Sequence, residues 1–390
     1  MTSDRLATVS EYYFSRKLQE LAAMNAEGKD VINLGIGSPD LPPAPAVIDA
    51  LTQHVKPAEN HKYQSYKGTP EFRKAFSSWY KKKFRVNLNP ETDILPLIGS
   101  KEGIMHISMA FLNDGDEVLV PNPGYPSYQA AANLAGAVIR PYQLKSSNEW
   151  APDFNNLENE GLDRVKLMWV NYPHMPTGAG LTNHLMGKLV DFARKHQIIL
   201  VNDNPYSFIL NDHPQSILKF ARPDDMVIEL NSLSKSHNMA GWRVGMAAGN
   251  PELIQNILTF KSNMDSGMFL PIQKAAIVAM EANDSWYKSL NKIYEKRRKL
   301  AWQFLDMLGC SYEKDTSGMF VWAHIPGSCK NGGTLSDEIL YQHNVFITPG
   351  FIFGSEGDQF VRVSLCTPEE IWNTSINRIK NLINHKITSI

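Results

Sequence analysis

The sequence predicts an α/β protein with a large domain, built on a mostly parallel sheet flanked by helices, and a smaller α+β domain. Short apolar segments bounded by turn residues recur through the first two thirds of the chain, as buried strands do. Helical patterns lie between several of them, and this alternation is typical of a parallel sheet with helices on both faces. After about residue 283 a long charged helix is followed by short strands, which indicates the second domain.

The expected strands of the large domain are short and apolar, and helices are expected at 100–112 and 183–196. Ligands in such sheets bind beyond the carboxyl ends of the strands. We therefore look for the functional residues just after these segments. The strands are expected at 94–98, 117–120, 138–144, 165–170, 198–202, 226–230 and 243–248.

The smaller domain is expected to begin with a helix at 285–308 and to end with a helix from Pro368. An amphipathic N-terminal arm at 10–27 is expected either to pack on this domain or to reach across to a partner. Short strands are expected between the two helices, at 319–324, 345–347 and 359–365. The predicted domain limits are 1–45 for the arm and part of the small domain, 46–284 for the large domain and 285–390 for the rest of the small domain.

Composition excludes several classes of protein. The 390-residue chain has a net charge of −1, which gives no electrostatic footprint for nucleic acid or for an anionic membrane. Its three cysteines, Cys310, Cys329 and Cys366, show no C-x-x-C spacing, which argues for a reducing compartment and against a zinc site. The N-terminus shows no signal-peptide pattern, and no apolar stretch approaches membrane-spanning length. We therefore expect a cytoplasmic protein without a metal and without a nucleic-acid or membrane partner.

The most informative segment contains Lys235. Residues 231–235 read N-S-L-S-K, and residues 241–245 read G-W-R-V-G. An amine that forms a Schiff base needs a rigid mount and a lowered pKa, while two hydroxyls (Ser232, Ser234) and a guanidinium (Arg243) are groups that hold a phosphate. A lone lysine after a buried strand is usually a surface residue, but here every position of the pattern is filled. The pattern resembles the lysine site of class I/II aminotransferases, which are fold-type-I enzymes that use pyridoxal 5′-phosphate (PLP).

A second anion site is expected where the strand at 94–98 gives way to a helix. Residues 99–103 read G-S-K-E-G, and the free N–H groups and dipole of a helix N-terminus attract anions. Glycine and serine open many helices, so the turn alone is a weak signal. Beside the Arg243 group it predicts that Ser100 and Lys101 also bind the cofactor phosphate.

The resemblance assigns further cofactor contacts. It implies that Tyr125, in P-N-P-G-Y, lies flat against the pyridine ring, and that Tyr206 bonds the ring's 3′-oxygen. Asp203 ends an otherwise apolar strand, where an unpaired carboxylate is costly. Pairing with the protonated ring nitrogen would satisfy it and make the ring an electron sink. A turn-capping aspartate is the alternative.

The resemblance also implies the substrate contacts and the assembly. Arg362 lies inside a strand pattern and matches the arginine that binds the substrate α-carboxylate bidentately. Gly37 matches a backbone position against that carboxylate, and Tyr12 is expected to cover the substrate. Tyr63 matches the tyrosine that reaches the phosphate of the neighbouring subunit, which implies a homodimer with shared active sites.

The chain departs from the family pattern at one position. The family reads N-P-T-G where residues 175–178 read M-P-T-G, and a methionine cannot donate the asparagine's hydrogen bond to the cofactor 3′-oxygen. His174 is either a substitute donor or a solvated loop histidine. The change places reaction specificity in question more than cofactor binding.

These residues predict an aminotransferase that moves an amino group between an amino acid and a 2-oxo acid by a ping-pong route through Lys235. Alanine- and LL-diaminopimelate-type enzymes are the most similar members of the family. Two alternatives stay open. One is a lyase (C–S β-elimination) or decarboxylase on the same cofactor, because cofactor electronics decide which bond breaks. The other is a non-catalytic PLP-binding regulator.

Overall fold

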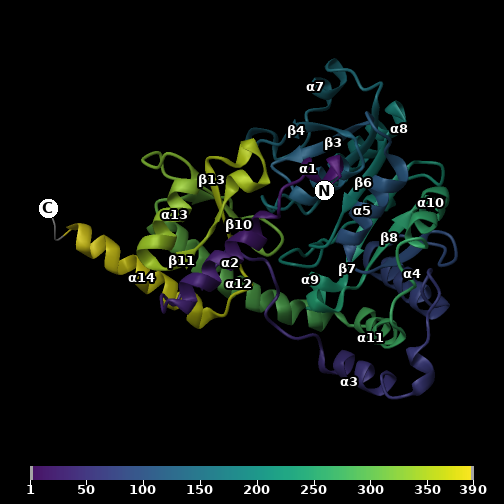
Figure 1. The fold of residues 1–390 in the computed structure, drawn as a ribbon, viewed down its shortest axis with the longest axis horizontal. Helices are drawn as coiled ribbons and strands as arrows, with labels where there is room; N and C mark the ends of the chain where they lie inside the picture. Colours follow the sequence, from purple (N-terminus) through teal and green to yellow (C-terminus); the bar gives the residue numbers. More distant parts are fainter. Residues whose placement is uncertain (1–2, 388–390) are drawn as a thin grey trace.

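The structure, a computed structural model, describes residues 3–387, with side chains described through residue 380. Two units are joined by the long helix α12 (Asp284–Met307), which runs from the large unit into the small one (Figure 1). Helix α12 begins at the predicted limit between residues 284 and 285. The numerical domain limits themselves remain a proposal.

A seven-stranded mixed sheet, mostly parallel, forms the centre of the large unit. All seven predicted strands are present, with ends shifted by up to two residues. β8 pairs antiparallel with both of its neighbours, whereas the other pairings are parallel. In spatial order the strands are β2 (Ile94–Leu97), β8 (Gly245–Gly249), β7 (Val227–Ser232), β6 (Ile199–Asp203), β5 (Val165–Val170), β3 (Glu117–Asn122) and β4 (Val138–Gln143).

The central strands are apolar on both faces because helices cover both. In β5, Leu167 and Trp169 belong to one buried cluster, while Met168 and Val170 belong to the other, as the two-residue period of a strand requires. The first cluster packs under α5 (Ser100–Phe111), α6 (Pro126–Leu134) and α10 (Pro251–Lys261). The second packs under α4 (Pro70–Phe84) and α8 (Asn183–His196), with α3 (Pro45–His54), α7 (Phe154–Asn159) and α11 (Leu270–Met280) further out.

The strand directions bring the predicted site residues to one edge of the sheet. β2, β3, β5, β6 and β7 run the same way, so the segments that follow them meet there. Because β8 runs the opposite way, its first residue, Gly245, pairs with the last residue of β7, Ser232. The reversed strand therefore brings Arg243 to the same edge as Lys235.

The small unit has a four-stranded antiparallel sheet in the order β12 (Thr348–Pro349), β13 (Phe360–Ser364), β10 (Phe320–His324) and β9 (Ser311–Tyr312). The predicted strands at 319–324 and 359–365 correspond to β10 and β13, and β11 (Val345–Phe346) corresponds to 345–347. Helices α12, α13 (Gly332–His343) and α14 (Glu369–Ile387) complete the unit.

The N-terminal arm packs on the small unit, which is the first of the two expected arrangements. After α1 (Asp4–Ala7), helix α2 (Tyr13–Ala26) buries Leu21 and Met24 against Leu340 and Phe346 (Figure 1). β1 (Ile32–Asn33) then pairs in parallel with β11. The described chain thus starts with α1 against α6 of the large unit, passes to the small unit with α2 and β1, and then enters the large unit at α3.

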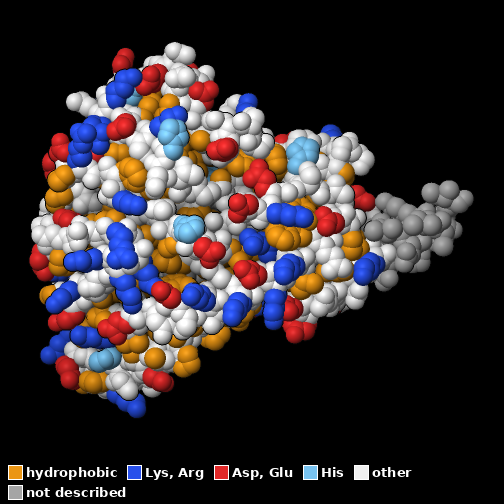
Figure 2. Space-filling model, turned by 180° about the vertical axis from the view of Figure 1, so that it is seen from behind, with side chains coloured by type: hydrophobic (Ala, Val, Ile, Leu, Met, Phe, Trp, Pro, Cys, Tyr) orange, Lys and Arg blue, Asp and Glu red, His pale blue; other side chains and the backbone are white. Residues whose placement is uncertain are grey.

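On the face drawn in Figure 2, basic and acidic side chains are interspersed. Within the described part of the chain, no helix combines the length and the apolar character needed to cross a membrane.

Candidate active site

A cavity of about 730 Å³ opens at this edge of the sheet. The predicted site residues, with the exception of Tyr63, all line it. They are Tyr12, Gly37, Ser100, Lys101, Tyr125, Asp203, Tyr206, Ser232, Ser234, Lys235, Arg243 and Arg362. A groove of about 880 Å³ elsewhere, along β4 and α7, is larger but is lined by none of them. We place the active site in the smaller cavity, where the chemically useful groups converge.

Lys235 lies in α9 (Leu233–Ser236), the short helix that follows β7. Its Nζ donates a hydrogen bond of 2.7 Å to the carbonyl oxygen of Gly37. Burial lowers the pKa of Lys235, and the positive charges of Arg362 and Arg243 lower it further. The amine is thus held on a short helix and is easier to deprotonate than the amine of a surface lysine. An amine that acts as a nucleophile or base needs both properties.

The hydroxyls of Ser232 and Ser234 and the guanidinium of Arg243 line the same cavity as Lys235. The Oγ atoms of Ser232 and Ser234 are 2.7 Å apart. Arg243 was expected inside a strand, and this expectation is wrong: it precedes β8 in a left-handed conformation (φ 59°) that ends a short 3-10 helix. In this conformation its guanidinium lies so close to Gly99 that a Cβ there would be 2.1 Å from Nη2. Together with the N-terminus of α5 at Ser100, these donors form a cradle for an anion.

Asp203 is the last residue of β6 and is almost fully buried. Its Oδ2 accepts a 3.0 Å hydrogen bond from Tyr128, while Oδ1 has no partner among the described residues. Burial raises the pKa of Asp203 to about 7, and the buried Glu229 on the next strand adds to the rise. A buried carboxylate that lacks one partner and faces a cavity fits a cationic ring nitrogen.

Three tyrosines and a lysine line the same cavity as Asp203. They are Tyr12, Tyr125, Tyr206 and Lys101. Tyr125 is half-buried, and its ring meets that of Tyr128 edge-on at 5.6 Å. Burial raises the pKa values of Tyr12 and Tyr206, so both remain neutral hydroxyl donors. The ammonium of Lys101 lies 4.7 Å from the ring centroid of Tyr12, which brings the N-terminal arm to the cavity as predicted.

Arg362, on β13, brings a cation into the cavity from the small unit. It is 4% exposed, and Nη2 donates to the carbonyl oxygen of Gly35 at 2.9 Å. Its guanidinium carbon lies 3.9 Å from the ring centroid of Phe320, but Nε has no partner among the described residues. Burial lowers the pKa of Arg362 to about 10, which leaves it charged at neutral pH and available to a carboxylate.

Met175 lines the cavity and sits between Arg362 and Asn171. Its sulfur is 3.2 Å from Nη1 of Arg362. Asn171 accepts the Met175 N–H at 2.9 Å and donates to the carbonyl oxygen of Asp203 at 2.5 Å. His174 is neither solvated nor at the cavity wall: it is 2% exposed, its Nδ1 is 2.8 Å from Thr177 Oγ1, and burial lowers its pKa to about 3. The structure thus supports neither expectation for His174.

Tyr63 lies outside the cavity of its own chain and is 90% exposed. Tyr66, Met264 and Phe269 are also exposed. The segments that carry these residues adjoin, because a Cβ at Gly267 would be 2.6 Å from the carbonyl oxygen of Gln64 and Phe269 meets His61 at 5.6 Å. Together Tyr63, Tyr66, Met264 and Phe269 form an exposed apolar patch.

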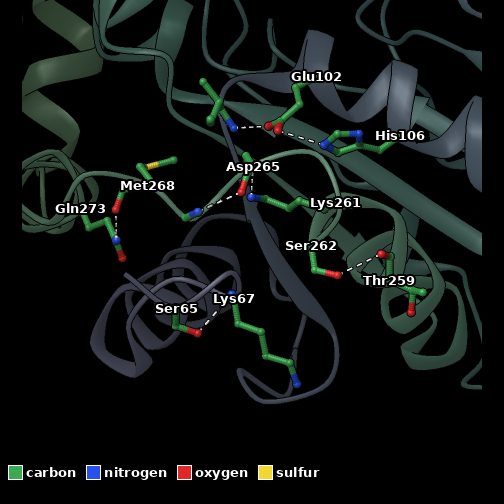
Figure 3. A network of polar contacts seen from close by, with 12 residues as sticks. Ser65, Lys67, Glu102, His106, Thr259, Lys261, Ser262, Asp265, Met268 and Gln273 are labelled. Atoms are coloured by element: carbon green, nitrogen blue, oxygen red, sulfur yellow. Dashed lines mark hydrogen bonds and ion pairs between the residues drawn. The ribbon is translucent and has the colours of Figure 1, made fainter. Parts of the chain in front are cut away.

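A largely buried polar network contains Glu102, His106, Lys261 and Asp265 (Figure 3). Glu102 accepts the N–H of Ile98 and pairs with His106 Nε2 at 2.9 Å, while Lys261 ion-pairs with Asp265. The carbonyl of the same Ile98 lies 3.4 Å from Arg243 Nη2. The two peptide groups that flank the Cα of Ile98 therefore contact different groups, one the network and the other the cradle.

The network has the spacing of a metal site but already contains its own cation. Ligand atoms of Glu102, His106 and Asp265 lie within 4.8 Å of one another. Lys261, which is 2% exposed, supplies the positive charge. We assign no metal here.

Sequence reasoning missed Tyr128, Asn171 and the Glu102 network. Tyr128 lies in the first turn of α6, three residues after the N-cap residue Tyr125, and this nearness in sequence is the one signal that pointed to it. The network joins α5 to the end of α10, about 160 residues later in the chain, and no local pattern predicts such a contact.

The fold is that of fold-type-I PLP enzymes. Residues 29–375 match the family model for aminotransferase class I and II. The LL-diaminopimelate aminotransferases of Nitratidesulfovibrio vulgaris and Aquifex aeolicus are 38% and 39% identical to the chain, and each alignment covers 97% of the chain and 98% of the relative. Substrate-bound BacF from Bacillus subtilis superposes with a TM-score of 0.93 at 35% identity, covering 98% of both chains. Alanine aminotransferase from Pyrococcus furiosus gives 0.90 at 26% identity, covering 99% of the chain and all of that structure.

The chain belongs to the class I and II aminotransferase family. It is a PLP-dependent aminotransferase, as the sequence predicted.

Proposed function

We propose that Lys235 is the amine that holds PLP and then transfers protons on the substrate, in a ping-pong exchange between an amino acid and a 2-oxo acid. The observation that carries this proposal is one cavity lined by three groups of complementary chemistry: the Lys235 amine, Asp203 Oδ1 without a partner among the described residues, and the Arg362 guanidinium, whose Nε also lacks one. Each group fits one part of the cofactor–substrate pair. The amine fits the aldehyde of the cofactor, the carboxylate oxygen fits its cationic ring nitrogen, and the guanidinium fits the carboxylate of the substrate.

When bound, PLP supplies an electron-withdrawing ring that stabilises negative charge at the substrate Cα. Asp203 keeps the ring nitrogen protonated by pairing with it, and Tyr128 and Asn171 hold Asp203 in place. Ser100, Ser232, Ser234 and Arg243 bind the phosphate, and Tyr125 and Tyr206 contact the ring and its oxygen.

Arg362 binds the substrate carboxylate. Lys235 Nζ lies beside the carboxylate position, where it donates a hydrogen bond to the carbonyl oxygen of Gly37. Once released, the Lys235 amine is the base that takes the proton from Cα and the acid that returns it. Its lowered pKa favours the uncharged form that this role needs.

Lys235→Ala tests the assignment, with the exposed Lys219→Ala as the matched control. We expect the amino-acid half-reaction, followed as conversion of bound PLP to the pyridoxamine form, to slow at least a thousandfold in Lys235→Ala. Borohydride reduction of the wild type should attach the cofactor to the peptide that contains Lys235. Labelling of another lysine would overturn the assignment.

The same half-reaction separates transamination from the lyase or decarboxylase alternative that Met175 keeps open. Transamination converts the bound cofactor stoichiometrically. Release of pyruvate and ammonia, or of carbon dioxide, without that conversion would instead show elimination or decarboxylation.

The proposal includes a homodimer in which Tyr63 completes the partner's cradle. Its support is the exposed apolar patch around a tyrosine that its own cavity does not use. Mixing Tyr63→Ala with Lys235→Ala tests it: hybrid dimers hold one site with both native residues, so about a quarter of wild-type activity should return. If no activity returns while hybrids form, the site is not shared.

A cytoplasmic location also belongs to this proposal. Its support is that Cys310, Cys329 and Cys366 are all free thiols. Cell fractionation tests it directly.

A further inference from the structure

We infer that the amino acid handled by this site has an apolar side chain, aromatic or long aliphatic. The inference rests on the proposed function and specifies its substrate class. What carries it is an apolar wall beside Arg362, made of Tyr12, Phe14, Leu18, Ile36, Phe320 and Phe353, which all line the cavity.

The N-terminal arm builds half of this wall. Phe14 and Leu18 are four residues apart on α2, so they share one face of the helix. Tyr12 caps the same helix and its ring lies 5.6 Å from that of Phe14. Leu18 lines the cavity but is 45% exposed. A large apolar side chain therefore stands partly uncovered at the cavity rim.

The wall stands where the substrate side chain must begin. The Arg362 guanidinium carbon is 3.9 Å from the ring centroid of Phe320, 4.6 Å from that of Phe353 and 5.6 Å from that of Phe14. A carboxylate bound by Arg362 brings the attached Cα beside these rings. Ile36 adjoins Gly37, whose carbonyl oxygen accepts from Lys235, so the wall also borders the reacting amine.

The charges in the cavity oppose a second ammonium group. Among the described lining residues, Asp203 is the one carboxylate, and its buried position at the end of β6 assigns it to the ring nitrogen. A distal ammonium, such as diaminopimelate carries, would lie against apolar side chains without a counter-charge, which is costly. Lys101 is the group that a distal carboxylate would use, and its ammonium already lies over the Tyr12 ring at 4.7 Å. Dicarboxylic amino acids are therefore the competing class.

Single-turnover half-reactions of the PLP-loaded enzyme test the inference with phenylalanine, leucine, glutamate and diaminopimelate. Added methylene groups in an apolar pocket raise the specificity constant by roughly tenfold or more. We expect phenylalanine and leucine to react at least about tenfold faster, as second-order rate constants, than the two charged substrates. Faster reaction of glutamate or diaminopimelate overturns this inference alone. Failure of every amino acid to convert the cofactor overturns the proposed function instead.

Equilibrium binding gives a second readout that needs no turnover. Calorimetry on the PLP-loaded enzyme should show tighter binding of 3-phenylpropanoate than of glutarate. Leu18→Asp should weaken 3-phenylpropanoate binding about tenfold and leave the cofactor absorbance unchanged. The matched control is Leu6→Asp, since Leu6 is 54% exposed and lies outside the cavity. Equal binding of the two acids, or equal effects of the two variants, contradicts the apolar subsite.

Discussion

The sulfur of Met175 lies 3.2 Å from Nη1 of Arg362, so a thioether meets the cation that we propose to bind the substrate, where the family pattern has an amide. A thioether is a weak acceptor and never a donor. In the proposed function, Met175 therefore leaves most of the hydrogen-bonding capacity of Arg362 to the substrate, and leaves Tyr206 as the donor to the cofactor oxygen.

Met175→Asn should lower the pH at which the visible absorbance band of the bound cofactor shifts. The added amide N–H stabilises negative charge on the ring oxygen, which makes the neighbouring imine nitrogen less basic. A spectroscopic pH titration measures this midpoint. Met264→Asn, at a methionine that is 51% exposed and outside the cavity, should leave it unchanged, and an unshifted midpoint in Met175→Asn would count against contact with the cofactor.

Arg362→Lys should reduce kcat/KM for the amino acid by about 10- to 100-fold, because lysine cannot form the bidentate pair. The loss should appear equally in the affinity for carboxylate inhibitors. The cofactor spectrum and PLP affinity should stay near wild type. A variant that lost PLP but kept inhibitor affinity would show that Arg362 acts on the cofactor instead.

Asp203 gives the cofactor-free protein a specific pH dependence. Its folded pKa, raised by burial to about 7, exceeds the ordinary aspartate value, so the folded state holds an extra proton between about pH 4 and pH 7. Stability therefore falls as the pH rises through this window, by something on the order of 4 kcal/mol.

Asp203→Asn should remove that fall, which urea unfolding of both cofactor-free proteins from pH 4 to 8 will measure. Burial lowers the pKa values of His174 and His237 to about 3. These histidines make the free energy of unfolding rise with pH up to their unfolded pKa. They do so in the wild type and in Asp203→Asn alike, so their contribution cancels in the difference between the two stability curves. Parallel stability curves would refute a protonated, buried Asp203.

Glu102→Gln should weaken PLP binding by about tenfold, because a neutral amide is a weaker partner than a carboxylate for the Ile98 N–H and for His106. The backbone at Ile98, whose N–H is held by Glu102 and whose carbonyl lies beside Arg243, would then be less well fixed. Glu158→Gln is the matched control: its pair with His196 is also 2.9 Å long but lies at the surface. Equal PLP affinities in the two variants would mean that the network does not support the cradle.

Local patterns predicted the elements that have strong local signals. The seven strands of the large sheet and helices α5, α8 and α12 are long apolar or amphipathic segments with turn residues at their ends. The two-residue strands β1, β9 and β12 were missed because their existence depends on distant partners, such as Val345 for Ile32. Helix α13, between β10 and β11, also escaped prediction.

The site shows the same division. Lys235 and Asp203 could be placed because each stands at the end of an apolar strand, where a charged group is conspicuous. The conformation of Arg243 could not, because the turn that reverses the chain into β8 determines it. The burial of His174 depends on the packing of its loop, which no spacing encodes.

The two units carry different halves of the proposed chemistry. Lys235, Asp203 and Arg243 belong to the seven-stranded sheet or its connections, while Tyr12, Phe14 and Arg362 are carried by α2 and β13 of the small unit. With these proposed roles, a small separation of the units would loosen the contacts that Arg362, Tyr12 and Phe14 make to the amino acid and would leave the phosphate contacts in place. Such a motion would let product and substrate exchange while the cofactor stays bound to the large unit.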